Sequence, residues 1–476
     1  AAAMGVDRIG KAGSALEKLV NLPHYAYPLL YTLALLATPA AVADDRLPAG
    51  LAADAWQQVQ AAIADQVDAE FAAGHDEALR GGLAAVHGLI RRHVLFGDYA
   101  DLPPQDAPDG PEFGYSVAME GDVLVVGAPG TVWTHVDHGT AAHGAVFVFR
   151  RGTDSTWQLS QRLLRANGTS GSQPGSRCGH AVALRLPDMV FGCPEMRQFG
   201  GQERRGGYYT YRLISSGFID ISNTFGPTDG GRCGAALALS PNYLAIGCPG
   251  DGGGPGQVRI AAKLDLAFNI GNPEAILTPG ADVFGFGWAL ALREPGTFFI
   301  GEPGNVRLAI GAPNTVFAGT AFPRGSVFAY RRALGSPTWT LDATLRPAPL
   351  GSSSAGLARF GAALAMNRNH LLVGAPNNRW SSVQSLPGPG TAHRYLLANT
   401  AGGWVWQHQE DSGPVNLPAG IDNGMGFGTA VGLGFDSLIA VGAPGTASPS
   451  GVRPEVGLTE VRRQAGGDWG LHSYWG

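Results

Sequence analysis

The segment that decides the fold is 360–376, FGAALAMNRNHLLVGAP. Its apolar residues alternate on either side of the turn Asn367-Arg368-Asn369, as expected for two antiparallel strands joined by a tight turn. The first such segment in the chain is 113–129, FGYSVAMEGDVLVVGAP, which has the same opening, the same ending and the same length. The sequence therefore contains a repeated β-hairpin.

The hairpin occurs six times from residue 113 onward. Its first residue is Phe in four copies and Cys in two, at Phe113, Cys178, Cys233, Phe286, Phe360 and Phe427. A third strand is predicted at 144–151 and 325–332, and a fourth begins at the tryptophans Trp157, Trp339, Trp404 and Trp469. Units of four short strands, spaced 53 to 74 residues apart, predict a β-propeller with one blade per repeat.

The composition agrees with this prediction. The 476 residues include Gly 71 and Pro 33, which disfavours long helices, and the 45% hydrophobic share supplies a large core. The net charge is -5 and like charges do not cluster in blocks, so we expect no nucleic-acid partner.

These repeats resemble the FG-GAP repeat family, whose best-known member is the amino-terminal propeller of integrin α subunits. The resemblance covers about residues 111–476 and rests on six copies of Phe/Cys-Gly followed by Gly-Ala/Cys-Pro. It implies an all-β propeller of four-stranded blades. Family propellers usually have seven blades, whereas six repeats are visible here, so six blades are favoured and seven stay open.

The residues before the repeats differ in kind. Residues 1–43 resemble a signal peptide, because Arg8, Lys11 and Lys18 precede the apolar stretch 29–37 and the small-residue site 41–43. A membrane anchor is the alternative, but the apolar stretch is shorter than the roughly 20 residues that a spanning helix needs. Residues 44–110 are predicted to form short amphipathic helices followed by a linker, and 111–476 form the propeller.

The four cysteines occupy equivalent places in two repeats. Cys178 and Cys193 are 15 residues apart, as are Cys233 and Cys248. Folding each hairpin places the two cysteines opposite each other, within disulfide reach, so we predict the bridges Cys178–Cys193 and Cys233–Cys248. A zinc site of four thiolates is the alternative, but its usual Cys-x2-Cys spacing is absent. Disulfides predict an oxidising location: extracellular, cell-surface or periplasmic.

The resemblance also implies where calcium would bind. Integrin-type members hold it in the loop between the first two strands of a blade, in a pattern resembling Asp-x-Asp-x-Asp-Gly-x-x-Asp. The corresponding turns here, such as Glu120-Gly121-Asp122, offer too few carboxylates for an ion that takes six to eight oxygen ligands. We therefore expect no cofactor, and calcium stays open mainly through loops such as 227–231 or 250–253.

Strand alternation brings the long, variable loops to one face of the propeller, where binding residues are usually placed. The exposed candidates for ligand binding are Trp133, His135, Arg197, Phe199, Arg204, Phe317, Arg379 and Trp380. A weaker candidate for a metal site is the set His135, Asp137, His138 and His143 in one of these loops.

The sequence thus predicts an exported adhesion or interaction module that binds an extracellular protein or glycan through this loop face. No catalysis is expected, because the sequence lacks Gly-x-Ser-x-Gly, His-Glu-x-x-His and the phosphate-loop pattern. The alternatives are a lectin-like propeller with one sugar pocket per blade, and an accessory domain of an extracellular hydrolase. We expect no stable membrane span once the signal segment is removed.

Overall fold

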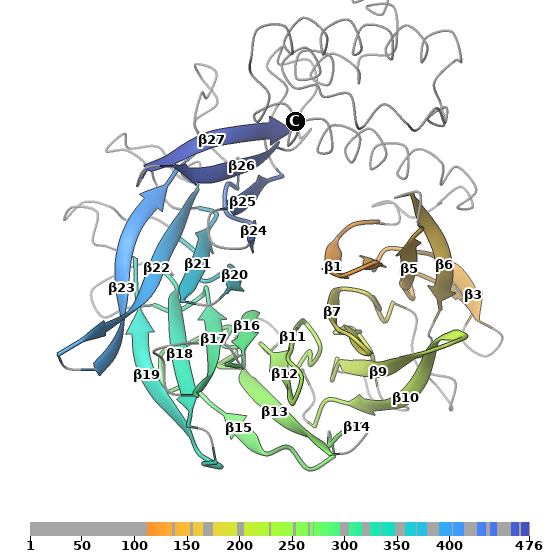
Figure 1. Ribbon diagram of the computed structural model, residues 1–476. Coiled ribbons are helices and arrows are strands. Elements are labelled where there is room, and N and C mark those ends of the chain that lie inside the picture. Colours follow the sequence, from red (N-terminus) through yellow and green to blue (C-terminus); the bar gives the residue numbers. More distant parts are fainter. Residues whose placement is uncertain are drawn as a thin grey trace, which may run out of the picture. The chain divides into compact units, whose positions relative to one another are not determined.

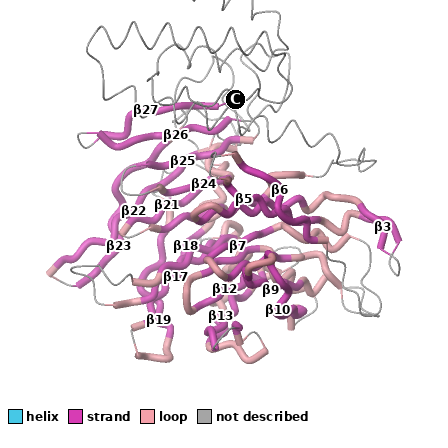
Figure 2. The backbone as a smooth tube through the Cα atoms, turned by 45° about the vertical axis from the view of Figure 1, so that its right-hand side comes forward, coloured by secondary structure: helices cyan, strands magenta, loops and turns pink. Residues whose placement is uncertain are grey.

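The computed structural model describes residues 112–475, with gaps confined to loops and turns. The gaps are 136–138, 153–155, 165–174, 198–203, 228–229, 251–253, 265–266, 270, 296–303, 317–323, 334, 348–357, 368, 378–389, 402, 414–425, 435–437, 445–457 and 466–467. The predictions for 1–43 and 44–110 lie outside the described residues. The described part consists of strands, turns and loops (Figure 2), and none of it forms a helix capable of crossing a membrane.

The chain divides into two compact units, residues 1–105 with 150–158, and residues 106–149 with 159–476. The second unit contains the repeats apart from residues 150–158, and Figure 1 shows the sheets following one another in sequence order around a central axis. This arrangement is a six-bladed all-β propeller, as the repeats predict.

The blades have the following strands. Blade 1 contains β1 (Ser116–Glu120), β2 (Val123–Ala128), β5 (Ala145–Arg151) and β6 (Trp157–Leu163). Blade 2 contains β7 (Ala181–Arg185), β8 (Asp188–Gly192), β9 (Gly207–Ile214) and β10 (Gly217–Phe225). Blade 3 contains β11 (Ala236–Leu239), β12 (Tyr243–Cys248), β13 (Gln257–Leu264), β14 (Ala267–Phe268) and β15 (Ala275–Leu277).

Blade 4 contains β16 (Ala289–Arg293), β17 (Val306–Ala312), β18 (Ser326–Arg332) and β19 (Trp339–Leu345). Blade 5 contains β20 (Ala363–Met366), β21 (His370–Ala375), β22 (Thr391–Thr400) and β23 (Gly403–Ser412). Blade 6 contains β24 (Ala430–Leu433), β25 (Leu438–Ala443), β26 (Leu458–Ala465) and β27 (Asp468–Trp475). A small hairpin of β3 (Trp133–His135) and β4 (Gly139–Ala141) lies in the loop between β2 and β5.

The strand positions confirm the hairpin register read from the sequence. In five blades the sheet order follows the chain order, and in blade 3 both β14 and β15 pair with β13. The predicted fourth strands begin at Trp157 and Trp339 themselves, and within one residue of Trp404 and Trp469. The second strand of each blade has a strand of its own sheet on either side, and the sheet packs between the neighbouring blades. Accordingly, all seven residues of β17, the second strand of blade 4, are buried. The outermost strand β6 has no buried residue.

Each described junction between blades has the same construction. The glycine before the third strand of one blade forms a parallel bridge with the opening residue of the next: Gly144 with Cys178, Gly206 with Cys233, Gly256 with Phe286, Gly325 with Phe360, and Gly390 with Phe427. The repeated opening residue is therefore an inter-blade contact as well as the start of a hairpin.

The two glycines of the motif also meet across each of these junctions. A Cβ on Gly374 would lie 1.9 Å from the carbonyl oxygen of Gly428, which opens the next blade. In blades 1 to 4, a Cβ added to the equivalent glycine would lie 1.9 to 2.1 Å from the corresponding carbonyl oxygen of the next blade. No side chain fits there, so the pairing of Phe-Gly with Gly-Ala-Pro is a steric requirement of blade packing.

Both predicted disulfides are present. Cys178 bonds to Cys193 and Cys233 bonds to Cys248, with Cα atoms 4.0 Å and 3.9 Å apart. All four residues are buried in the cores of blades 2 and 3. In other blades the opening position holds a phenylalanine that packs on the third strand, as Phe286 does against Phe328 with ring centroids 5.4 Å apart.

Candidate binding pocket

A pocket of about 580 Å³ lies on the face where the blades open. It draws on blades 1 to 4 through Tyr115, His180, Ala235 and Trp288, each of which follows the glycine of its opening motif. The remaining lining residues come from loops of the same face: Ala142, Gly175, Arg177, Glu195, Arg197, Arg204, Arg232 and Pro249. This is the face on which the sequence predicts the long loops.

Two of the arginines hold an unfavourable backbone conformation. Arg177 and Arg232 directly precede the opening cysteines, with φ of 52° and 50°. Blades 4 and 6 place Gly285 and Gly426 at this position, with φ of 71° and 68°. A non-glycine residue in this left-handed region costs about 1 kcal/mol. Blades 1 and 5 place Glu112 and Arg359 at this position, with φ of 50° and 53°, so four of the six blades have a charged residue there.

Ion pairs fix these arginines between blades. Arg177 Nη2 lies 2.5 Å from Glu112 Oε2, and Arg232 Nη2 lies 2.6 Å from Glu195 Oε1. The other oxygen of Glu195 is 2.6 Å from Arg204 Nε. Glu195 thus holds two guanidinium groups side by side at the pocket wall, where planar donors suit a further anionic group.

A hydrogen-bonded chain crosses the axial side of the pocket. His180 Nδ1 is 3.2 Å from the carbonyl oxygen of Ala235, which can only accept, so Nδ1 donates. The Nε2 atom of the neutral ring then accepts from the Tyr115 hydroxyl at 3.0 Å. Burial, together with the charges of Arg177 and Arg232, lowers the pKa of His180 to about 4. His180 is therefore neutral at pH 7, and the positive charge of the pocket comes from the arginines.

Aromatic surface completes the wall. Trp288 is 37% exposed, and the Arg359 guanidinium lies over its ring at 5.3 Å from the centroid. The Tyr115 ring packs against His180 in a tilted arrangement, with ring centroids 4.7 Å apart and an interplanar angle of 47°. Four arginines line the pocket with one carboxylate, so the pocket has an excess of positive charge beside flat apolar surfaces. Such a lining suits a ligand that carries carboxylate or sulfate groups on a partly apolar frame.

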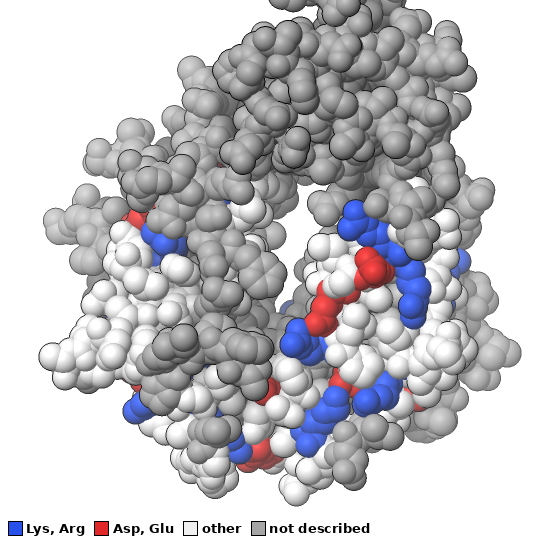
Figure 3. All heavy atoms as spheres, in the orientation of Figure 1, with Lys and Arg blue, Asp and Glu red and all other residues white. Residues whose placement is uncertain are grey.

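Basic and acidic side chains are interspersed over blades 1 to 3 in the view of Figure 3. Ion pairs between neighbouring blades account for part of this pattern. For example, Arg185 on β7 pairs with Glu120 on β1 at 2.5 Å, at the opposite end of the strands from the pocket.

Of the ligand-binding candidates from the sequence, Arg197 and Arg204 line the pocket and pair with each other through an isolated antiparallel bridge. Four other candidates lie outside the described residues: Phe199, Phe317, Arg379 and Trp380. His135 is placed on β3, but the description does not extend to its side chain.

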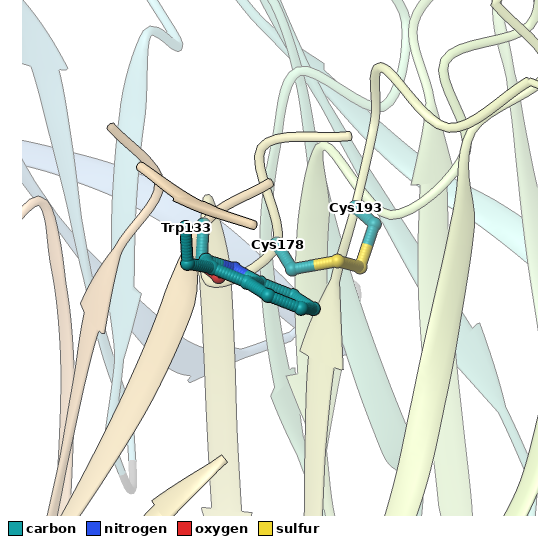
Figure 4. Close-up of a disulfide and its surroundings, with 4 residues drawn as sticks. Trp133, Cys178 and Cys193 are labelled. Atoms are coloured by element: carbon teal, nitrogen blue, oxygen red, sulfur yellow. A yellow bond between two sulfur atoms is a disulfide. The ribbon is translucent and has the colours of Figure 1, made fainter. Parts of the chain in front are cut away.

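Trp133 has contacts within the fold. Its indole N–H donates to the carbonyl oxygen of Gly144 at 3.0 Å, and its ring lies 4.9 Å from the ring of buried His143. Figure 4 shows the indole beside the Cys178–Cys193 disulfide. Of the metal candidates in this loop, Asp137 and His138 lie outside the described residues.

The calcium prediction concerns turns that the structure largely describes. Glu120 accepts hydrogen bonds from Arg185 and from the backbone N–H of Leu186, and Asp188 pairs with Arg212 and Lys263. These carboxylates join neighbouring strands and blades. Within the loops 227–231 and 250–253, residues 228–229 and 251–253 lie outside the described part of the chain.

Sequence reasoning missed the axial half of the pocket. Tyr115, His180 and Trp288 lie 65 and 108 residues apart along the chain, and each looks like an ordinary strand-edge residue. The signal that could have identified them is positional: equivalent residues of consecutive blades converge at the propeller axis. Applied to the residues flanking each opening motif, this rule also selects Arg177 and Arg232.

The fold defines the class: a six-bladed β-propeller, with a pocket on the face formed by the openings of several blades. Comparison with known families agrees. The chain carries an FG-GAP repeat, since residues 96–149 match the family model of that name. A search of curated proteins finds no match.

Proposed function

We propose that the protein is a non-catalytic binding module, exported or displayed at the cell surface, that takes an acidic extracellular ligand in the pocket of blades 1 to 4. The observation that carries this proposal is the arginine cluster around Glu195. Arg177 and Arg232 hold strained backbone conformations there, and Arg204 shares the Glu195 carboxylate. The ligand is a protein or glycan segment whose carboxylates or sulfates pair with these guanidinium groups.

The chemistry of the pocket favours binding over catalysis. A general base must have a nitrogen or oxygen available to the substrate. Both ring nitrogens of His180 are already engaged, one by Tyr115 and the other by the Ala235 carbonyl. Burial also raises the pKa of the Tyr115 hydroxyl, which keeps its proton at neutral pH. An accessory role beside an extracellular hydrolase is compatible with the same binding chemistry.

The proposed location follows from the disulfides. Two buried bridges form and persist in oxidising surroundings, so they support an extracellular, cell-surface or periplasmic site of action. Adhesion is the corresponding role for a rigid propeller that presents a charged binding face.

The lectin-like alternative makes a different geometric demand. It requires one equivalent sugar pocket in each blade, whereas the pocket described here combines residues of four blades in a single cavity. A stoichiometry of one ligand per chain is therefore expected.

The test is binding of an acidic polysaccharide and a poly-glutamate peptide to the full chain, each measured at several salt concentrations beside a neutral polysaccharide. Arg204→Gln should weaken binding of the acidic probe by about 10-fold or more, since a hydrogen bond to a charged group contributes about 1.5–3 kcal/mol. The matched control is Arg185→Gln, which removes an arginine from a similar ion pair at the other end of blade 2.

The two acidic probes distinguish a glycan from a protein ligand, and the chain length of the polysaccharide after incubation reports hydrolysis. Equal binding by Arg204→Gln, Arg185→Gln and the natural sequence would exclude the pocket as the binding site. Shortening of the polysaccharide would refute the non-catalytic assignment.

A further inference from the structure

Blade 5 contains a second cluster of functional side chains, on the two long strands β22 and β23 (Figure 1). It consists of His393, His408 and Asp411, whose potential ligand atoms all lie within 4.8 Å of one another. The cluster belongs to a different blade from those that line the arginine pocket, and the proposed ligand binding does not use it.

The strand register explains how the three side chains meet. His393 is directly opposite Asp411, and Tyr395 is opposite His408, so all of these residues share one face of the blade. A register shift between Arg394 and Tyr395 inserts one extra residue into β23. Without this bulge, residue 408 would fall on the other face, because neighbouring residues of a strand alternate.

The contacts are short and converge on one atom. His393 Nδ1 and His408 Nε2 each lie 2.5 Å from Asp411 Oδ1. The second nitrogen of His393, Nε2, lies 2.9 Å from the Thr391 hydroxyl. A histidine that binds a metal through one nitrogen characteristically hydrogen-bonds through the other, which fixes the ring and its tautomer.

Burial differs in a way that suits a site open to solvent. His393 is 2% exposed and packs against Phe360 at 5.0 Å between ring centroids, whereas His408 is 42% and Asp411 32% exposed. One buried, anchored imidazole thus lies beside a partly exposed carboxylate and an exposed, adjustable imidazole.

We propose that His393, His408 and Asp411 form a binding site for a divalent transition metal of the zinc class. Two imidazoles and one carboxylate are ligands preferred by zinc, whereas calcium takes oxygen ligands only. Three protein ligands leave a fourth position for water or a ligand group.

Metal binding requires only a small adjustment of the site. A tetrahedral ion with bonds of about 2.0–2.1 Å holds its ligand atoms about 3.3 Å apart. The two contacts of 2.5 Å with Asp411 Oδ1 must therefore widen by less than about 1 Å, and the two imidazole nitrogens, at most 4.8 Å apart, must approach by up to about 1.5 Å. Rotations of the partly exposed Asp411 and the exposed His408 side chains supply these shifts. Each imidazole then binds through the nitrogen that now faces Asp411, and His393 donates its remaining N–H to Thr391 Oγ1.

Other charged groups near the cluster are already paired. Arg394 and Glu410, adjacent to these residues on the opposite face of β22 and β23, pair with each other at 3.0 Å. Tyr395, on the same face, directs its hydroxyl to the carbonyl oxygen of Arg346 at 3.4 Å. Glu410 therefore provides a control: its removal changes the local charge without removing a proposed ligand.

The experiment is calorimetric titration of the full, tag-free chain with Zn²⁺, repeated with Co²⁺ and read by its visible absorption. The variants are His408→Ala and Asp411→Asn, with Glu410→Gln as the control. We expect each ligand variant to lose one metal equivalent or to bind it about 100-fold more weakly, since loss of even an outer-shell partner costs 10–100-fold. The control should bind as the natural sequence does.

Thermal melting separates loss of binding from loss of folding. Zinc should raise the melting temperature of the natural sequence and of Glu410→Gln, but not that of His408→Ala, whose mutated side chain is exposed. Binding of the same number of equivalents by His408→Ala and by the natural sequence would overturn the proposal, because any zinc would then sit elsewhere. Failure of the natural sequence to bind zinc at micromolar concentrations would also overturn it.

Discussion

Blades 2 and 5 fill the same position in the fold with different chemistry. Blade 2 joins Cys178 to Cys193 by a disulfide, while blade 5 has Phe360 and Ala375 at the same separation of 15 residues. All four side chains are buried, and both openings form the same parallel bridge to the preceding blade. The comparison shows that a propeller blade needs this position filled, and that either a covalent bond or an aromatic ring can fill it.

The surrounding side chains differ accordingly. The Phe360 ring packs against His393 and Tyr395 of the third strand, with centroids 5.0 Å and 6.3 Å apart. In blade 2 the third-strand residues Tyr209 and Tyr211 instead stack on Phe191 of the second strand. In blade 2, where the disulfide replaces the opening phenylalanine, the aromatic ring that contacts the third strand therefore comes from the second strand.

The largest effect is expected from glycines that both kinds of blade share. Gly192→Ala and Gly374→Ala each place a methyl group 1.9 Å from a carbonyl oxygen of the next blade. Each should destabilise the fold by more than about 4 kcal/mol or prevent folding, as measured by chemical denaturation. The control is Gly442→Ala in blade 6, where the nearest described atom is 3.4 Å away. Equal stability of all three variants would contradict the steric account of the motif.

The next largest effect is expected from Phe360→Ala. Truncation of a fully buried phenylalanine leaves a cavity and should lower the free energy of unfolding by about 3–5 kcal/mol. Phe360→Leu, which fills most of the volume, should lower it by less than about 1.5 kcal/mol. If both substitutions had the same effect, the aromatic ring would not be what fills this position.

Removal of a disulfide should have a slightly smaller effect. The paired change Cys178→Ala and Cys193→Ala opens a loop of 15 residues, for which the expected loss is about 3 kcal/mol. The matching change at Cys233 and Cys248 should have the same effect, since the separation is identical. Chemical denaturation with and without reductant checks this. In the variant with all four cysteines replaced by alanine, the reductant should no longer change the free energy of unfolding.

Introducing the cysteine pair of blade 2 at the equivalent positions of blade 5 tests directly whether a disulfide can replace the aromatic ring. Phe360→Cys with Ala375→Cys should form a third disulfide, detected as an oxidised mass six hydrogens below that of the fully reduced chain, against four for the natural sequence. The bond adds about 3 kcal/mol and loss of the ring removes about 3–5 kcal/mol, so stability should change by less than about 2 kcal/mol. Free thiols in the oxidised protein would mean that blade 5 holds these positions in a different geometry.

The smallest effect is expected from Arg359→Gly, at the position before Phe360. Glycine relieves the left-handed backbone at φ 53°, worth about 1 kcal/mol, and removes the contact with Trp288, worth about 0.5–1 kcal/mol. Stability should therefore change by less than about 0.5 kcal/mol. In contrast, Arg232→Gly should weaken binding of the acidic probe, which equilibrium titration would measure.

The fold was predictable because its determinants recur. In blades 1 to 5 the second motif glycine has no room for a side chain, and in four blades a tryptophan begins the fourth strand or lies within one residue of its start, so the register can be read from the sequence. The disulfide pairing could also be predicted, since the cysteines replace the same two motif residues in both blades. The predicted all-β propeller, its six repeats and its two disulfides are confirmed.

The functional sites were less accessible to sequence reasoning, for two physical reasons. The arginine pocket unites Tyr115, His180 and Trp288 across blades, and only the closure of the propeller around its axis brings them together. The cluster of His393, His408 and Asp411 depends on a single-residue bulge in β23 that decides which face His408 occupies. Strand alternation alone would have placed His408 on the wrong side of the blade.

The position of the two cysteine openings has a consequence for when the protein becomes active. Arg177 and Arg232 are covalently adjacent to Cys178 and Cys233, so each bridge anchors the backbone of one pocket arginine. A newly made chain with reduced thiols must order both segments when its ligand arrives, and the lost conformational entropy opposes binding. Oxidation removes that cost in advance. The proposed ligand recognition would thereby be coupled to oxidation: the chain would reach full affinity only after both bridges have formed.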